Sequence, residues 1–218
     1  MIKMSATAEA NIKWPISPPK QPARKVSWPE FQRKYLSRED GYKYEWLNGT
    51  IEKSKRGIDK TQLYILRTIQ KHFRAKLQEG LVFGELVSEP DLFFLDNHRR
   101  PDIAWLTDEQ IDLLTYDSKD VPAFVIEVIS TNDQINRVEQ KMDDYRAAGV
   151  QVVWHVFPLL GKVHVYGGEK LSSMKVVAGE QICSAEPVLA GFEMKVEELL
   201  RKPELLRKPE LPRDSYRR

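Results

Sequence analysis

The chain of 218 residues has one cysteine, Cys183, and no long apolar run. One cysteine excludes an intramolecular disulfide framework and any zinc cluster built on cysteines. No apolar run approaches the roughly 20 residues that span a bilayer. The N-terminal sequence, MIKMSATAEANIKW, also lacks the continuous apolar segment of a signal peptide. We therefore expect a cytoplasmic protein with no membrane partner.

The net charge is also small, +2, because 34 Lys and Arg nearly balance 32 Asp and Glu. The ends are basic, however, and the middle of the chain is acidic. The two ends, residues 1–29 and 198–218, also hold eight of the 13 prolines and none of the 11 glycines, and proline-rich segments join helices and sheets poorly. We predict a flexible N-terminal arm at residues 1–26, a single domain at 27–200, and a Pro/Arg/Lys-rich tail at 201–218. The tail contains the LLRKPE repeat, interpreted as a solvated segment or a basic arm that touches phosphates.

Hydrophobic periodicity within the domain predicts a mixed sheet with helices packed on it, an α/β (α+β) fold. Asn48-Gly49 lies between two alternating runs and indicates a hairpin over residues 42–54. Ser27 is expected to cap a short helix, because Pro29 and Glu30 follow it. Longer helices are expected at 60–79, with Leu63, Leu66, Ile69, Phe73 and Leu77 on the apolar face, and at about 132–148. Further strands are expected at 81–86, 91–95, 102–106, 123–129, 152–157 and 162–166.

One acid interrupts an apolar strand, in the run Phe-Val-Ile-Glu-Val-Ile that contains Glu127. A strand that is apolar on both faces is usually buried on both faces. A buried carboxylate then needs either a fixed cation or a bound metal ion. The strand by itself leaves both interpretations open.

A second acid opens another apolar strand and could share a divalent ion with Glu127. Asp102 follows Pro101 in this way, 25 residues before Glu127, but Asp91 follows Pro90 in the same pattern. Aspartate at a strand boundary is also a common turn residue. Spacing does not choose between Asp91 and Asp102.

Lys141 lies on the helix expected over residues 134–148. At 100° per residue it falls about 40° from Tyr145 and about 60° from Val138, at the flank of the apolar face that also includes Ile135 and Met142. Its side chain can either extend to solvent along the apolar surface or reach toward the preceding strand.

Taken together, these motifs resemble the Uma family of restriction endonucleases, a branch of the PD-(D/E)XK nuclease superfamily. The resemblance covers residues 42 to about 166 and rests on the runs YEWLNG (44–49), RPD (100–102), IEVIS (126–130) and the segment from Lys141 to Trp154. It implies a restriction-endonuclease-like fold, a central mixed sheet with helices on both sides. It also selects Asp102 over Asp91 and assigns Lys141 the role of the superfamily's catalytic lysine.

The resemblance implies an endonuclease that hydrolyses phosphodiester bonds of DNA with Mg²⁺, or Mn²⁺ as a substitute. Asp102, Glu127 and the carbonyl of Val128 would hold the ion, and Lys141 would orient or activate water. Glu45 would bind a second ion or tune the first, with a solvent-facing hairpin acid as the alternative. Cleavage of both strands would favour a homodimer. Six basic residues near the site are candidates for phosphate contacts, with a solvated loop as the alternative for each: Lys53, Lys55, Arg56, Lys60, Arg99 and Arg100.

Two departures from the family's pattern bear on activity. Arg137 stands where many relatives have an aspartate four residues before the helical lysine, and no histidine lies near residues 60–63. The alternatives to an active nuclease are a non-catalytic nucleic-acid-binding or interaction module on the same scaffold, and a protein in which Glu127 and Lys141 form a structural ion pair.

Overall fold

The computed structural model describes residues 24–55, 60–113, 115, 119–130 and 133–201. The strands are β1 (Tyr42–Leu47), β2 (Thr50–Lys55), β3 (Glu85–Ser88), β4 (Leu92–Phe94), β5 (Asn97–Arg99), β6 (Ile103–Leu106), β7 (Phe124–Val128), β8 (Val152–Phe157), β9 (Lys162–Gly167), β10 (Ser173–Ala178), β11 (Ile182–Ser184) and β12 (Glu193–Lys195). The α-helices are α1 (Trp28–Phe31), α2 (Lys60–Gln78), α3 (Asp108–Asp112), α4 (Ile135–Ala148) and α5 (Val196–Leu199), with a π-helical turn at Gln32–Leu36 and a 3₁₀ turn at Glu169–Leu171.

A six-stranded sheet in the order β10-β9-β8-β7-β6-β3 forms the centre of the fold. Its neighbouring strands are antiparallel except for β7 and β8, which α4 connects as a parallel pair. A second sheet has the order β2-β1-β5-β4, and β11 and β12 form a separate pair. The predicted mixed sheet with flanking helices is confirmed.

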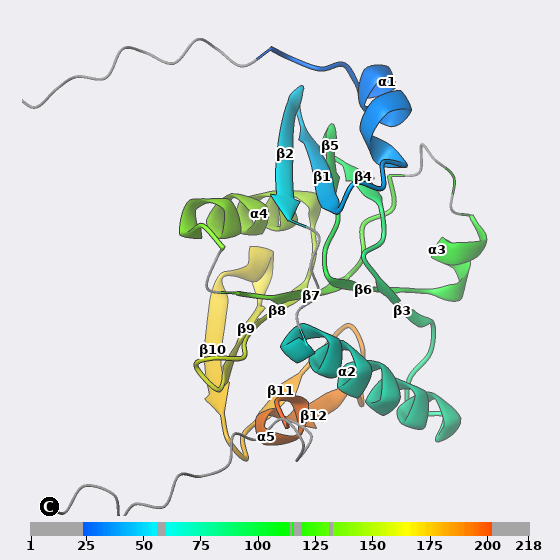
Figure 1. Ribbon diagram of the computed structural model, residues 1–218. Coiled ribbons are helices and arrows are strands. Elements are labelled where there is room, and N and C mark those ends of the chain that lie inside the picture. Colours follow the sequence, from blue (N-terminus) through cyan, green and yellow to red (C-terminus); the bar gives the residue numbers. More distant parts are fainter. Residues whose placement is uncertain (1–23, 56–59, 114, 116–118, 131–132, 202–218) are drawn as a thin grey trace, which may run out of the picture.

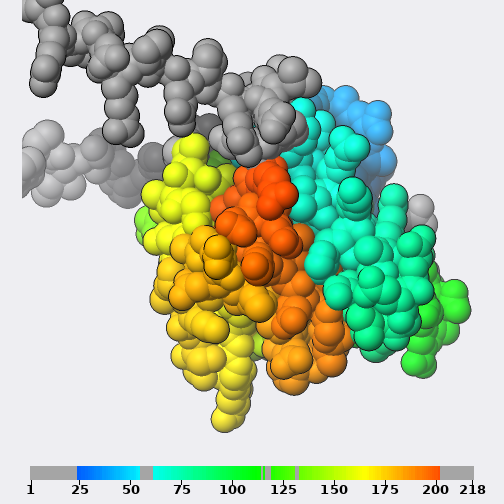
Figure 2. All heavy atoms as spheres, turned by 90° about the horizontal axis from the view of Figure 1, so that it is seen from below, coloured from blue at the N-terminus to red at the C-terminus, as the bar shows by residue number. Residues whose placement is uncertain are grey.

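The central sheet is covered on both faces (Figure 1). One face packs against α2, β11, β12 and α5 in a cluster that includes Ile69, Trp154 and Phe192. Seen from that side, α2 lies beside the C-terminal elements (Figure 2). The opposite face packs against α4 and the four-stranded sheet, through residues such as Phe94 and Tyr145.

Strand β7 is buried along its whole length, and its side chains alternate between these two layers because a strand has a period of two. Phe124, Ile126 and Val128 belong to the cluster under α2, whereas Val125 belongs to the cluster under α4. Glu127 has the parity of Val125. The alternation therefore directs this acid toward α4 and the four-stranded sheet.

Helix α4 ends as the sequence predicts, but its buried face is shorter than expected. Gly149 follows it with φ of +93°, a left-handed cap that glycine adopts without strain. Met142 and Tyr145 are buried, whereas Ile135, predicted on the same face, is 68% exposed. The first turn of α4 extends beyond the edge of the core, so only its later turns bury their apolar side chains.

The hairpin predicted at residues 42–54 is confirmed. Asn48 and Gly49 both have positive φ, as a two-residue turn between β1 and β2 requires. A second hairpin, β4–β5, has the same backbone geometry at Leu95 and Asp96. No turn residue pair of the usual type marks it, so β5 was absent from the predicted strands.

The strand predicted at residues 81–86 has the wrong bounds. The observed strand, β3, begins only at Glu85 and ends at Ser88. Gly84 has φ of +71° and lies against the backbone of Leu106, while the indole of Trp105 donates to the carbonyl of Phe83 at 2.8 Å. These contacts bend the chain just before β3.

Helix α2 buries part of the predicted stripe. Ile69 and Phe73 are buried as predicted, with Ile65 beside them and Leu66 partly buried, whereas Leu63 is 54% and Leu77 43% exposed. The two ends of the predicted stripe face solvent, because the apolar residues of this helix extend around more than one face. Among the described residues, no helix is both long enough and apolar enough to cross a membrane.

The segment before α1 is attached to the β1–β2 hairpin. Val26 is buried, its amide donates to the carbonyl of Gly49, and its own carbonyl accepts from the indole of Trp46, both at 2.7 Å. Ser27 caps α1 as predicted. Residues 1–23 of the predicted arm and all but the first three residues of the LLRKPE repeat lie outside the described residues.

Replacement of Gly84 by alanine should destabilise the protein by about 3 kcal/mol, because strain at positive φ adds to a steric clash. An added Cβ would lie 2.3 Å from the carbonyl oxygen of Leu106. Gly80→Ala is the matched control, since Gly80 has φ of +69° with nothing within 4 Å of the added atom, and should cost about 1 kcal/mol. Urea unfolding measures both, and equal losses would contradict the steric explanation.

Candidate active site

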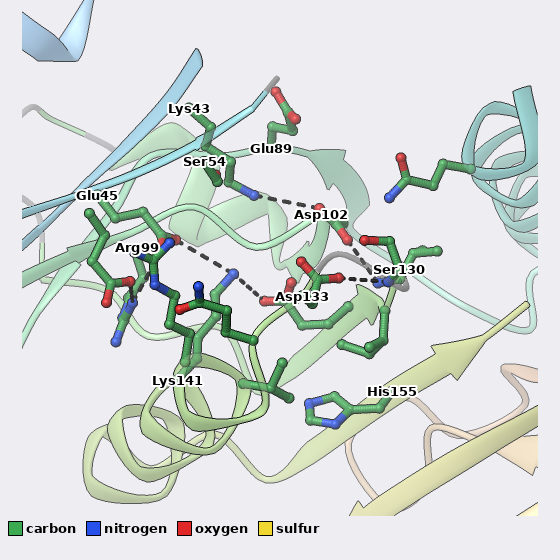
Figure 3. Close-up of a pocket in the computed structure, with 18 of the residues that line it drawn as sticks. Lys43, Glu45, Ser54, Glu89, Arg99, Asp102, Ser130, Asp133, Lys141 and His155 are labelled. Carbon is green, nitrogen blue, oxygen red and sulfur yellow. Dashed lines mark hydrogen bonds and ion pairs between the residues drawn. The ribbon is translucent and has the colours of Figure 1, made fainter. Parts of the chain in front are cut away.

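A pocket of about 500 Å³ opens between the first half of α4, the start of α2, the β1–β2 hairpin and the C-terminal end of β7. Figure 3 shows the polar side chains that surround it. They come from both sheets and both long helices: Lys43, Glu45, Glu52, Lys53, Ser54, Gln62, Glu89, Arg99, Asp102, Glu127, Ser130, Asp133, Gln134, Arg137, Lys141 and His155. All four predicted catalytic residues lie in this set.

Asp102 and Glu127 come from neighbouring antiparallel strands. Ile103 pairs with Ile126, so the same register, extended by one residue, places Asp102 opposite Glu127. Opposed side chains on adjacent strands lie about 5 Å apart at Cβ. The second carboxylate oxygen of Asp102 accepts from the amide of Val128 at 2.7 Å, which fixes its orientation. The structure thus brings together the two acids of the predicted metal site.

Lys141 reaches this pair from α4. Its Nζ lies 2.7 Å from Oε1 of Glu127 and 3.5 Å from Oε1 of Glu45, and it donates to the carbonyl of Arg100 at 3.4 Å. Burial disfavours the ammonium form, but the charges of Glu127 and Glu45 prevail and raise the pKa of Lys141. Lys141 is therefore a charged amine held over the acids, and its head does not extend to solvent.

Glu127 itself is desolvated and has a second partner besides Lys141. Its Oε1 accepts a hydrogen bond from the Tyr145 hydroxyl at 2.5 Å. Burial raises the pKa of Glu127, against the lowering effect of the Lys141 charge and with a further increase from Asp102. Burial and the charge of Glu127 raise the pKa of Tyr145, so the phenol remains a hydrogen-bond donor.

Glu45 is buried, so the alternative of a solvent-facing hairpin acid is wrong. Burial opposes its charged form, but Lys141, Lys43 and Arg99, with a hydrogen bond from the Arg100 amide, lower its pKa to about 2. That amide lies 2.7 Å from Oε1 of Glu45. Both carboxylate oxygens therefore face cationic or N–H groups of the protein.

Arg99 holds the two layers of the site together. It is 1% exposed, and its Nη1 lies 3.2 Å from both Glu45 and Glu52, which are opposed on β1 and β2. Its Nε donates to Asp144 of α4 at 2.7 Å. Opposed like charges repel across a strand pair, and Arg99 offsets this repulsion.

The structure corrects the expectation that Arg99 and Arg100 contact phosphates. Arg99 is enclosed by carboxylates, and the Arg100 guanidinium binds Asp91. Lys53 is exposed at the pocket, and its Nζ lies 3.5 Å from the centre of the Tyr42 ring. The side chains of Lys55, Arg56 and Lys60 lie outside the described residues.

Asp91, the other aspartate that follows a proline, is not part of the pocket. It precedes β4 in the four-stranded sheet and accepts from Arg100 and from Nε2 of His98, the latter at 2.8 Å. These bonds give it a structural role at the edge of that sheet. The geometry thus agrees with the choice of Asp102.

Two further pocket residues escaped prediction. Lys43 projects from β1, and its Nζ lies 3.5 Å from Oδ1 of Asp102. His155 on β8 pairs with Glu127 in the parallel register, and burial with the nearby Lys141 charge lowers its pKa to about 3. His155 is thus neutral at physiological pH. Neither residue could be found from spacing, since each reaches the site through strand pairing.

The two departures from the family's pattern also lie at the pocket. Arg137 is exposed on the first turn of α4, where its Nη1 donates to the Lys53 carbonyl at 3.5 Å. Gln62 lines the pocket at the start of α2, in the stretch where a histidine was sought. Both positions therefore border the cavity that contains the acids.

The fold is shared with a solved structure. The chain resembles in fold the crystal structure of a putative nuclease belonging to DUF820 from Anabaena variabilis ATCC 29413, with a TM-score of 0.64 and 15% sequence identity over 80% of this chain and 97% of that chain. At this identity the similarity concerns the fold. A search of curated proteins finds no match.

The family follows from the sequence itself. The sequence model of the Uma2 family, described as a putative restriction endonuclease, matches residues 28–197. The chain belongs to this family, as its motifs predict. The match includes Glu45, Asp102, Glu127 and Lys141.

Replacement of Arg99 by methionine should cost about 3–5 kcal/mol of unfolding free energy, because it leaves the buried Glu45 and the partly buried Glu52 and Asp144 without their shared cation. Arg24→Met removes an arginine whose side chain is 79% exposed and which pairs with Glu30, and should cost no more than about 1 kcal/mol. Chemical denaturation compares the two variants. Similar small losses would show that Arg99 does not hold the layers together.

The lowered pKa of Glu45 predicts a pH-dependent contribution to stability. A depressed carboxylate pKa stabilises the fold above the unfolded value of about 4.5, and this stabilisation is lost as the pH falls toward about 2. Wild type should exceed Glu45→Gln by about 3 kcal/mol at neutral pH, and the difference should shrink between pH 4.5 and 2. Unfolding free energies measured across this range test it, and a constant difference would contradict it.

Proposed function

We propose that the protein is a divalent-metal-dependent endonuclease that hydrolyses phosphodiester bonds of DNA. The observation that carries this proposal is the convergence of Asp102 and Glu127 from adjacent strands, with the Lys141 ammonium 2.7 Å from Glu127. Membership of a family described as putative restriction endonucleases supports the reaction class. Double-strand cleavage would require two such sites, in keeping with the predicted homodimer.

The donor set suits Mg²⁺ or Mn²⁺ better than zinc. The described residues contain no group of three or more His, Cys, Asp or Glu side chains arranged to hold a metal ion. Mg²⁺ commonly takes only one or two carboxylates and completes its coordination with water and phosphate. Asp102 and Glu127 would supply these carboxylates, and the carbonyl of Val128 is the predicted third protein donor.

When bound, such a cation supplies charge that favours deprotonation of water and offsets the negative charge developing on the phosphate. Lys141 would orient the attacking water, since its ammonium already lies 2.7 Å from Oε1 of Glu127. Glu45 would act through Lys141, because both of its oxygens are occupied by protein donors. Lys43, whose Nζ lies 3.5 Å from Oδ1 of Asp102, would bind a phosphate oxygen beside the cation.

The charge of the pocket supports a phosphate substrate. Six carboxylates and five Lys or Arg side chains line it, so its formal charge is close to neutral. A divalent cation would make the pocket positive overall. The acidic character of the site is thus compatible with an anionic substrate.

The second candidate is a structural ion pair between Glu127 and Lys141. It is favoured because protein groups already bind the Glu127 carboxylate. Lys141 and Tyr145 both engage the same carboxylate oxygen, and a buried pair of this kind can serve the fold without catalysis. This candidate predicts no cleavage and no stabilisation by divalent ions.

Cleavage of plasmid DNA with Mg²⁺ or Mn²⁺ tests the proposal. Asp102→Asn and Glu127→Gln should each lower the rate at least 100-fold, because each removes a charged metal ligand. Asp91→Asn is the matched control and should retain cleavage, since Asp91 lies outside the pocket. An RNA substrate in parallel defines the nucleic acid, and full activity of folded Glu127→Gln would overturn the proposal.

Thermal unfolding separates the two candidates. A metal site formed only in the native state should raise the melting temperature with Mn²⁺, and this shift should disappear in Asp102→Asn. A structural ion pair predicts no shift, together with a Lys141→Met variant that loses stability without a change in any activity.

A further inference from the structure

Helix α2 has an unusual charge pattern. Its 19 residues include five Lys or Arg and no Asp or Glu. Three of them, Arg67, Lys71 and Arg74, are exposed, and at 100° per residue they fall within about 60° of one another. We call these three residues the α2 basic stripe.

The α2 basic stripe is uncompensated by its surroundings. Surface helices usually pair opposite charges at i,i+4, whereas like charges at this spacing are destabilising. Arg67 and Lys71 are such a like-charged pair. Within the described part of the chain, no carboxylate lies within ion-pair distance of the three side chains, in contrast to Lys76, which lies 3.5 Å from Glu79.

Along the helix axis, the α2 basic stripe begins where the pocket-lining residues of α2 end, on the solvent-facing side of the helix. Gln62 and Leu66, on the first two turns of α2, line the pocket, and Arg67 follows directly. At 1.5 Å per residue, the helix extends the stripe about 10 Å from Arg67 to Arg74. In Figures 1 and 2, α2 runs along the outside of the molecule away from the centre of the sheet.

We propose that the α2 basic stripe binds the phosphodiester backbone of duplex DNA that extends from the pocket along α2. The identity of this ligand rests on the proposed nuclease function. Lys and Arg that neutralise phosphates supply affinity without reading sequence. The stripe thus supplies the backbone contacts that Arg99 and Arg100, buried in ion pairs, do not make.

The packing of α2 argues against a membrane surface as the ligand. An interfacial helix inserts its apolar face among the lipids. The apolar face of α2, formed by Ile65, Ile69 and Phe73, is already buried against the central sheet. Besides the stripe, α2 exposes Leu63 and Leu77. These two leucines lie near opposite ends of the helix, about 20 Å apart at 1.5 Å per residue, and form no continuous apolar face for a membrane.

Fluorescence anisotropy with a labelled 20-base-pair duplex tests the stripe. In an Asp102→Asn background with Mg²⁺, which limits cleavage, the triple variant R67Q/K71Q/R74Q should bind about 10- to 100-fold more weakly near 100 mM salt. The slope of log K against log salt should become shallower by about 2.7, because each lost phosphate contact accounts for about 0.9.

The matched control is K170Q/K175Q/K195Q, which removes the same charge from exposed lysines of the β9–β12 region. It should lower affinity much less and leave the slope nearly unchanged. Thermal unfolding of both triple variants checks that each is folded, as expected for exposed substitutions.

Equal affinities and slopes in the two triple variants would overturn the proposal. So would a stripe variant that binds DNA normally but loses binding to phosphatidylserine vesicles. Stripe-dependent DNA binding by a protein that never cleaves DNA would support the stripe and refute the nuclease activity. The two proposals therefore fail separately.

Discussion

The need to neutralise Glu127 governs the arrangement of the site. This acid lies in a strand buried from end to end, where a lone carboxylate would cost several kcal/mol. The alternation of β7 turns it toward α4, and α4 brings Lys141 and Tyr145 to the same oxygen. The parallel crossover from β7 through α4 to β8 is thus the unit on which the candidate chemistry depends.

A second charge network joins this unit to the four-stranded sheet. Arg99 contacts Glu45 and Glu52 from that sheet and Asp144 from α4. Glu45 in turn faces Lys141. Because the two networks share Glu45, the orientation of Lys141 is coupled to the docking of the second sheet. Buried charges of this kind contribute geometry more than net stability.

Local patterns marked two candidate residues of the site but left the role of each open. Glu127 was recognisable because an acid interrupts an apolar strand, and Lys141 because helical periodicity places it beside Tyr145. Asp102 could be separated from Asp91 only by family resemblance, since the register between β6 and β7 is not encoded in either segment alone. The fold class followed in the same way from the periodicity of its elements.

Long-range pairing explains what could not be predicted. Arg99 resembles a surface residue until the pairing of β1 with β5 encloses it, and Lys43 reaches Asp102 only across two sheets. The strand β5 was missed because Leu95 and Asp96 form a tight turn without glycine. The α2 basic stripe could not be assigned to the solvent side from sequence, because the buried face of α2 is set by the packing of Ile65, Ile69 and Phe73.

The central claim is that Asp102 and Glu127 form a divalent-cation site beside Lys141. A crystal structure after soaking with Mn²⁺, with the anomalous signal of manganese recorded, tests it most directly. The account predicts an anomalous peak in contact with both carboxylates and within the pocket below α4. Well-ordered side chains with the Glu127–Lys141 pair intact and no peak between the two acids would contradict it.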